Sequence, residues 1–142
     1  MEVLRRNTDY AIRAMINLAR HFDSEAVSTS MIAEKEEIPY QLACKIMQRL
    51  SKAGLVKSCM GTKGGFRLEK KPCKISLFDV IGAVQGPVLI NKCSRHGFKC
   101  SQRSECPVTG KIEELQGFLE GYLKKISIDE LAQIQLKKTH TT

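Results

Sequence analysis

Apolar residues recur three and four positions apart along the first third of the chain, which is the spacing of one face of an α-helix. The pattern predicts a first helix over residues 8–22, with Asn7 or Thr8 as its N-cap. It predicts a short second helix over residues 28–37, which a serine or threonine at its start can cap. Each helix presents one apolar face and therefore has to pack against a core.

A third helix is predicted between Pro39 and Gly54. Proline leaves no hydrogen bond unmade at the first helical position, and glycine is common just after the end of a helix. The apolar side of this helix is centred on Leu42, Ile46 and Leu50, and the other side is basic and amide-bearing, which suits the major groove of DNA. The candidate DNA contacts on this helix are Tyr40, Gln41, Lys45, Gln48 and Arg49.

Two short extended runs follow, over residues 55–60 and 66–68, and the glycines between them predict a β-hairpin with a basic tip. The order of helix, short helix, basic helix and hairpin is typical of a winged helix-turn-helix, in which the third helix reads DNA and the hairpin follows the backbone or minor groove. A hairpin with a purely structural role is the alternative. The predicted fold class is mainly α, a winged helix-turn-helix DNA-binding domain with a long C-terminal dimerisation helix.

Three more helices are predicted in the second half of the chain. Ser76 and Asp79 can form a capping box for a helix through Gln85. Residues 111–126 carry an apolar stripe over about four turns, which favours packing against a second copy of the chain. Packing against the first helix of the same chain is the alternative. A short last helix through about residue 135 and a frayed tail are expected to follow.

These elements predict three parts of the chain. Residues 1–86 form the DNA-binding domain, and residues 87–108 form a cysteine-bearing loop. Residues 109–142 form the dimerisation helix, the short C-terminal helix and the tail.

The composition fits one modest folded domain, because 42% of the 142 residues are hydrophobic and 27% are charged. No run approaches the roughly 18 apolar residues that cross a bilayer, and no export signal is evident. We therefore expect a cytoplasmic protein without a membrane partner, whose thiols are kept reduced.

The formal net charge of +8 is concentrated in two segments. Residues 45–71 hold eight basic residues and one acidic residue, and residues 87–106 hold four basic residues and one acidic residue. A concentrated basic segment is typical of a protein that binds a polyanion such as DNA. A solvated lysine-rich face is the alternative, and charge alone does not separate the two.

Three of the six cysteines, Cys93, Cys100 and Cys106, lie within fourteen residues on a polar segment. Three thiolates so placed can hold an iron-sulfur cluster or zinc, and unligated thiols are the third alternative. Structural zinc sites usually show paired cysteines two residues apart, which this segment lacks. The other three cysteines lie far apart on separate elements and have the character of small apolar residues.

Several motifs resemble one family in the same order along the chain. They are residues 8–14 (TDYAIRA), 61–66 (GTKGGF) and 76–84 (SLFDVIGAV), followed by the three loop cysteines. Together they resemble the Rrf2 (Rrf-two) family of bacterial transcription factors, which contains iron-sulfur cluster regulators. The resemblance runs from about residue 2 to residue 134.

The resemblance implies a homodimeric winged-helix repressor that dimerises through the long helix and binds a cluster with Cys93, Cys100 and Cys106. The fourth ligand differs between members. Where cluster-biogenesis members have a histidine, this chain has Thr109. Nitric-oxide sensing members use an aspartate on the first helix of the opposite subunit, and Asp9 matches it.

Two other readings concern the fourth ligand. An aspartate in the first turn of a helix is also favoured by the helix dipole, and this alone accounts for Asp9. His96 is the competing ligand within the loop. Six residues separate Cys93 from Cys100, where the family usually has about five, and this departure bears on the type of cluster more than on its presence. A [4Fe-4S] cluster is favoured, and [2Fe-2S] is the alternative.

The resemblance also bears on the DNA contacts. Gln41 and Lys45 match groove-facing positions of the recognition helix. Met60 stands where the family has a wing arginine, so Thr62 and Lys63 are the candidate contacts from the hairpin.

The function expected is that of a transcriptional regulator that binds a palindromic operator and senses nitric oxide, redox state or iron availability through its cluster. A cluster-free regulator that responds to a metabolite or to thiol oxidation is the alternative. An electron carrier or zinc module is a third class. The three histidines are scattered without a partner for nucleophilic catalysis, so an enzyme is not expected.

Overall fold

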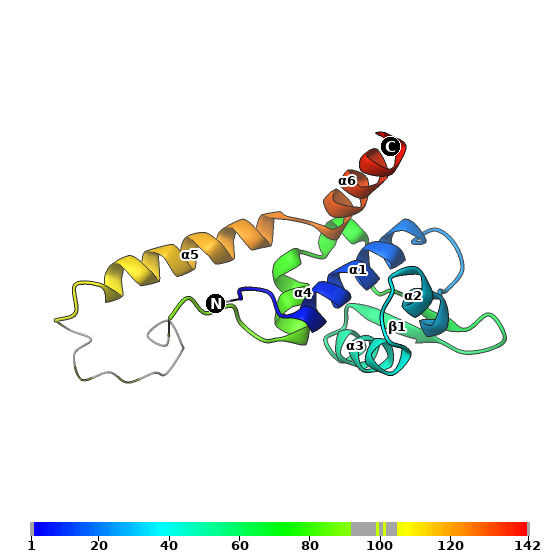
Figure 1. Ribbon diagram of the computed structural model, residues 1–142, viewed down its shortest axis with the longest axis horizontal. Coiled ribbons are helices and arrows are strands. Elements are labelled where there is room, and N and C mark those ends of the chain that lie inside the picture. Colours follow the sequence, from blue (N-terminus) through cyan, green and yellow to red (C-terminus); the bar gives the residue numbers. More distant parts are fainter. Residues whose placement is uncertain (1, 92–98, 100, 102–104, 142) are drawn as a thin grey trace.

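Helices dominate the computed structural model, which describes residues 2–91, 99, 101 and 105–141 of the chain (Figure 1). Two short strands form a single antiparallel hairpin between the third and fourth α-helices. The elements are α1 (Arg6–Arg20), α2 (Thr29–Lys35), α3 (Tyr40–Lys52), β1 (Val56–Cys59), β2 (Gly65–Leu68), the 3-10 helix η1 (Pro72–Lys74), α4 (Leu77–Val84), α5 (Thr109–Lys125) and α6 (Ile128–Thr141). The mainly helical fold with a small hairpin confirms the predicted fold class.

Helix α1 lies at the centre of the main core and buries a face that includes Ala11, Met15 and Leu18. It begins two residues before the predicted start, and its N-cap, Arg5, makes no side-chain capping bond. The prediction of Asn7 or Thr8 as the cap was wrong. The reason is tertiary, because the Thr8 hydroxyl is buried and donates to Gln85 Oε1 at 2.7 Å.

Helices α2 and α3 form the helix-turn-helix. The Ser28 side chain accepts a hydrogen bond from the Met31 backbone N–H, which confirms a hydroxyl cap at this helix. Pro39 is the N-cap of α3 and not its first helical residue. Gly54, with a φ of +76°, stands just past the C-cap of α3, as predicted. The core side of α3 buries Ala43, Ile46, Met47 and Leu50.

Strands β1 and β2 pair in the register Val56↔Leu68 to Cys59↔Gly65, and this confirms the predicted hairpin. The hairpin is fastened to the loop after α1, because Val27 and Phe66 exchange backbone hydrogen bonds of 2.9 and 2.8 Å. The absence of a side chain at Gly65 allows strand β2 to lie this close to Val27, since a Cβ atom at Gly65 would overlap the Val27 carbonyl group.

Helix α4 starts with the predicted capping box between Ser76 and Asp79. Its Val80 and Val84 side chains enter the main core, whereas Ile81 packs with Val88 and Leu123 in a second, smaller core. Helix α5 is held by this second core and projects away from the rest of the protein (Figure 1).

Helix α6 returns to the first half of the chain and packs on α1. Ile128 is fully buried in the main core, and its backbone N–H donates to Ile75 O at 2.9 Å. The prediction of a short last helix followed by a frayed tail was wrong, because α6 continues to Thr141. Acidic residues in its first turn and basic residues in its last turn favour this length through the helix dipole.

None of the helices in the described part of the chain combines the length and the apolar character that crossing a bilayer requires.

We expect Gly65→Ala to lower the free energy of unfolding by at least about 2 kcal/mol, because the strand must move away from Val27. Urea denaturation followed by circular dichroism measures the change. Gly82→Ala is the matched control, since a Cβ at this position in α4 meets open space and gains up to about 1 kcal/mol of helix propensity. Equal effects of the two substitutions would contradict the close approach at Gly65.

Candidate DNA-binding surface and cysteine segment

The outer side of α3 is largely polar because Ala43, Ile46, Met47 and Leu50 turn to the core. Lys45, Gln48 and Arg49 are exposed on this side, one turn apart or adjacent. Tyr40 and Gln41 are exposed in the first turn of the same helix. All five residues predicted to contact DNA from this helix therefore lie on its solvent side.

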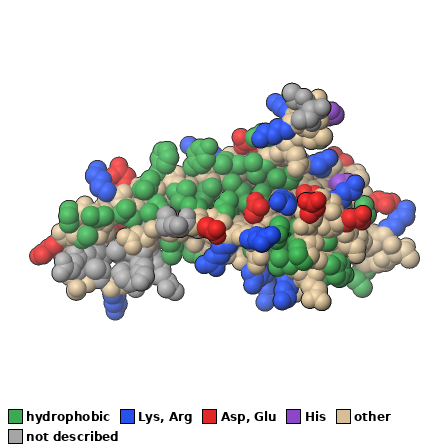
Figure 2. Space-filling model, viewed as in Figure 1, with side chains coloured by type: hydrophobic (Ala, Val, Ile, Leu, Met, Phe, Trp, Pro, Cys, Tyr) green, Lys and Arg blue, Asp and Glu red, His purple; other side chains and the backbone are tan. Residues whose placement is uncertain are grey.

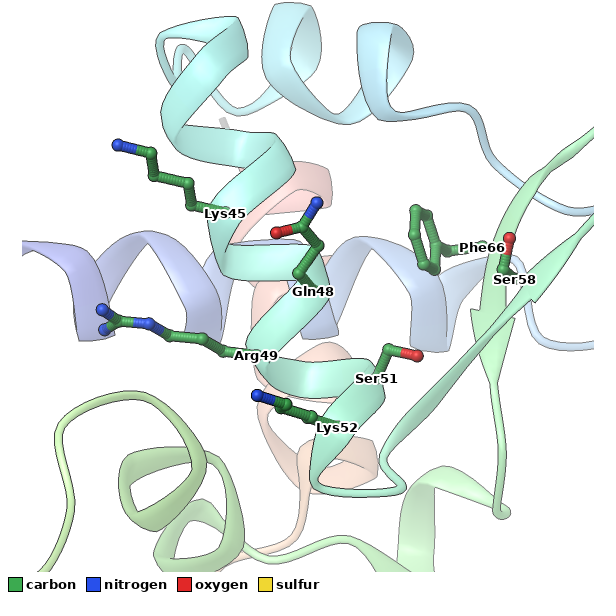
Figure 3. Close-up of a pocket in the computed structure, with 7 residues that line it drawn as sticks. All are labelled: Lys45, Gln48, Arg49, Ser51, Lys52, Ser58 and Phe66. Atoms are coloured by element: carbon green, nitrogen blue, oxygen red, sulfur yellow. The ribbon is translucent and has the colours of Figure 1, made fainter.

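An open cleft of about 610 Å³ runs between α3 and the hairpin. In Figure 3 the long basic side chains of α3 extend from one side of the helix, and Phe66 and Ser58 lie beyond its other side on the strands. The lining residues are Lys45, Gln48, Arg49, Ser51, Lys52, Ser58 and Phe66. The last four were not among the predicted DNA contacts. A hairpin register that pairs Ser58 with Phe66 places these two on one face.

Arg49 has a second partner that the sequence did not reveal. Its Nη1 donates to the Val84 carbonyl at 3.0 Å, at the C-terminal end of α4. A guanidinium group has five N–H donors, so this bond leaves others for a phosphate or a base. A cation at the end of a helix is also favoured by the helix dipole. Arg49 thus connects the recognition helix to α4.

The two predicted hairpin contacts, Thr62 and Lys63, are exposed at the tip. Lys63 Nζ forms an ion pair with Glu25 Oε1 at 3.0 Å, and both side chains are largely exposed. Such an exposed pair is worth about 1 kcal/mol or less, so a phosphate group can replace Glu25 as the partner of Lys63. The Arg67 guanidinium donates to the Ser24 carbonyl at 2.9 Å and holds the same loop against the hairpin.

Tyr40 is the predicted contact nearest to a thiol. A hydrogen bond with Cys44, one helical turn later, and the charge of that thiol both raise the pKa of the Tyr40 phenol. An ordinary phenol is already protonated at neutral pH, and these contacts make its ionisation less favourable still, so Tyr40 keeps a hydroxyl donor at the edge of α3.

Cys106 is the one residue of the predicted cluster-binding trio that lies within the described residues. Hydrogen bonds from the Thr109 side chain and from the backbone N–H groups of Val108 and Thr109 lower the pKa of its thiol. These groups belong to the start of α5, where the helix dipole also favours negative charge. The thiolate is the form that binds metal, so Cys106 fits a ligand of iron or zinc.

Cys93, Cys100 and the competing ligand His96 lie outside the described residues. Within residues 2–91, 99, 101 and 105–141, the side chains of His, Cys, Asp and Glu do not gather in groups of three or more that would hold a metal ion.

Asp9, the predicted fourth ligand, is exposed in the first turn of α1. Its Oδ2 lies 3.8 Å from Arg13 Nε, a weak contact across one helical turn. The carboxylate is therefore accessible to a ligand or to another subunit. Its place at the helix N-terminus equally fits the dipole explanation.

Gln116 holds the backbone that leads into the cysteine segment, and sequence reasoning missed it. This residue of α5 is buried, and its Nε2 donates to Val88 O at 2.6 Å. Its Oε1 accepts from the Ile90 N–H at 3.1 Å. A glutamine on the inner side of an otherwise apolar stripe was the signal available in the sequence.

Comparison with known proteins agrees with this geometry. The sequence model of the Rrf2 family, described as an iron-dependent transcriptional regulator, matches residues 4–134. The chain belongs to the Rrf2 family. The HTH-type transcriptional regulator IscR of Aliivibrio salmonicida is 34% identical over 123 residues, which cover 86% of this chain and 72% of that protein.

Two solved structures share the fold of this Rrf2 protein. IscR of T. potens aligns with a TM-score of 0.74 and 27% identity, over 93% of this chain and 87% of that one. CymR, the global cysteine regulator of B. subtilis, aligns with a TM-score of 0.76 and 23% identity, over 94% and 98% of the two chains. The protein is a transcriptional regulator of the Rrf2 family, and the prediction that it is not an enzyme is confirmed by its relatives.

Proposed function

We propose that this Rrf2 regulator is a homodimeric repressor that binds a palindromic operator and senses nitric oxide, redox state or iron availability through an iron-sulfur cluster. The observation that carries the DNA-binding part is the cleft between α3 and the hairpin, whose lining includes three basic side chains. The support for the cluster is the thiolate-favouring site of Cys106 and the iron dependence in the family's description.

In the proposed complex α3 enters the major groove. Gln41 and Gln48 carry amides that can pair with adenine, and Lys45 and Arg49 can bind guanine or phosphate. Thr62 and Lys63 at the hairpin tip follow the backbone, where Lys63 exchanges Glu25 for phosphate. Phe66 forms an apolar wall of the cleft beside these polar groups.

The outer face of α5 supports the proposed dimer. Leu115, Phe118 and Tyr122 follow one another at steps of three and four residues, and Phe118 and Tyr122 are 74% and 60% exposed. Figure 2 shows hydrophobic side chains gathered along this projecting part of the protein. The inner side of α5 packs on α4 through Leu119 and Leu123, so the predicted stripe serves two surfaces. An apolar seam with coiled-coil spacing is well suited to a second copy of itself.

Cys93, Cys100 and Cys106 are the proposed thiolate ligands, and Asp9 of the partner's α1 is the proposed fourth ligand. We favour a [4Fe-4S] cluster, with [2Fe-2S] as the alternative. When bound, a cluster supplies iron that reacts with nitric oxide or oxygen and that is lost when iron is scarce. The hydrogen bonds to Cys106 lower the pKa of its thiol and so favour the thiolate, and the exposed Asp9 carboxylate can reach across a subunit interface.

A continuous set of contacts joins the cysteine segment to α3. Cys106 precedes the first turn of α5, and Gln116 of α5 binds the backbone at Val88 and Ile90. Leu123 and Val88 pack on Ile81 of α4, and the end of α4 accepts the hydrogen bond from Arg49. A shift of α5 therefore changes the support of the recognition helix, which is how the ligation state would alter DNA affinity.

Lys45→Ala is expected to weaken binding to an operator duplex about tenfold. If the Lys45 ammonium group contacts phosphate, the substitution also reduces the slope of log affinity against log salt concentration by about one. Fluorescence anisotropy with a duplex selected from a random pool measures both quantities. Lys138→Ala on α6 is the control, because this exposed lysine lies outside the cleft lining. Wild-type affinity of Lys45→Ala would overturn its assignment as a DNA contact.

Phe118→Glu is expected to convert the dimer into a monomer, because a carboxylate would be buried in the seam. Sedimentation velocity measures the mass. Ile134→Glu on α6 places the same charge at another exposed apolar residue and should leave the dimer intact. A dimeric Phe118→Glu protein would show that α5 is not the interface.

Protein purified without oxygen is expected to contain iron and sulfide and to absorb visible light. The Cys106→Ala protein is expected to lose most of the iron, the sulfide and the visible absorption. Asp9→Ala should keep a cluster that decays faster in air, whereas Asp23→Ala, an exposed aspartate beyond α1, should behave as wild type. A colourless wild-type protein without iron would support the cluster-free regulator instead. An unchanged spectrum and unchanged decay in air of Asp9→Ala would exclude Asp9.

A further inference from the structure

One glutamine side chain joins residues 3–8 to the end of α4. Gln85 is the C-cap of α4. Its Oε1 accepts from the Thr8 hydroxyl at 2.7 Å and from the Arg5 backbone N–H at 3.1 Å. Its Nε2 donates to the Val3 carbonyl at 3.0 Å. The partners lie 77 to 82 residues away in sequence, so this one amide fastens together two segments that are distant along the chain.

The peptide group between Val84 and Gln85 holds the side chain of Arg49. The last carbonyls of a helix have no partner within the helix, and Val84 O accepts from Arg49 Nη1 at 3.0 Å. The N–H of the same peptide group belongs to Gln85 and donates to Ile81 O at 2.9 Å. Helix α4 ends at this point, so the orientation of the peptide group also depends on the bonds of the Gln85 side chain.

Thr8 is buried, and this separates its effect from direct contact with DNA. Its exposed fraction is 0%, whereas Arg49 is exposed on the outer side of α3 and lines the cleft. The Thr8 hydroxyl can therefore influence DNA binding only through the groups that it touches. A side chain that is held in place before binding loses less conformational entropy when it binds, and this favours affinity.

We propose that Gln85 is a positioning residue for DNA binding, which holds Arg49 in the orientation that its contact with DNA requires. The Thr8 hydroxyl and the backbone before it fix the Gln85 amide, and the peptide group at the end of α4 passes this constraint to the guanidinium. Residues 3–8 thereby contribute to operator affinity although none of them lines the cleft. The inference rests on the proposed function in taking Arg49 as a DNA contact.

The first test removes the Thr8 hydroxyl while keeping the shape of the side chain. Thr8→Val in the full chain, purified without oxygen, is expected to weaken binding to the selected operator duplex about fivefold. Thr8→Ser keeps the hydroxyl and should bind as the wild type does. Fluorescence anisotropy measures the affinity, and circular dichroism shows that each variant is folded. Wild-type affinity of the Thr8→Val protein would overturn the proposal.

A double-mutant cycle with Arg49 separates this role from a general loosening of the fold. In the Arg49→Ala protein, adding Thr8→Val is expected to cause no further loss of affinity, because the side chain that is positioned is gone. A fivefold loss in both backgrounds would overturn the proposal. Wild-type affinity of Arg49→Ala would overturn both this inference and the Arg49 contact of the proposed function. Weak binding by Arg49→Ala with wild-type binding by Thr8→Val would overturn this inference alone.

Gln85→Leu is the second variant, and it decides if Thr8→Val fails to fold. It removes all three side-chain bonds and is expected to weaken operator binding at least fivefold, whereas Gln133→Leu, the same change at an exposed glutamine of α6, should leave the affinity unchanged. Nuclear magnetic resonance relaxation of the arginine Nε–H groups in the free protein reports the positioning directly. The order parameter of Arg49 is expected to fall in Gln85→Leu while that of Arg67, which has its own hydrogen bond, stays the same. An unchanged order parameter of Arg49 would overturn the proposal.

Discussion

Helix α4 is buried on two sides, and the positions of the recognition helix and of α5 both depend on this shared burial. Val80 and Val84 contribute to the core under α3, while Ile81 contributes to the core under α5. The end of α4 adds directional bonds, because the Val84 carbonyl accepts from Arg49 and the neighbouring Gln85 side chain accepts from Thr8. Apolar packing is not directional by itself, whereas these hydrogen bonds fix the rotation and register of the helices around α4.

Local signals in the sequence predicted most of the elements correctly. The capping box at Ser76 and the glycine after α3 act within a few residues, so their effect on the chain is visible without the fold. Two of the missed features, the positions of Thr8 and Gln116, depend on residues far away in sequence. Thr8 is an internal residue of α1 because Gln85 lies next to it, and Gln116 is buried because Val88 offers it a carbonyl group.

The apolar stripe of α5 shows the limit of periodicity as evidence. Leu119 and Leu123 pack within the chain, whereas Phe118 and Tyr122 are exposed, yet all four belong to one helical pattern. Spacing predicts which residues share a face, and it carries no information on which partner covers that face. The same reasoning applies to the cysteines, since their spacing predicts ligand chemistry while the state of Cys106 depends on the start of α5.

Two backbone hydrogen bonds join the start of α4 to the junction between α5 and α6, and they affect how such regulators can diversify. Leu77 N–H donates to Ile126 O at 2.8 Å, and Ile128 N–H donates to Ile75 O at 2.9 Å, so the chain leaves and returns at one place. Residues 77–126, which include α4 and α5, therefore form an excursion whose two ends are joined by these bonds. Within this excursion, the segment between α4 and α5 can change in length and cysteine spacing while α4 keeps its contacts with α3. The entropic cost of lengthening a loop whose ends are already joined is small.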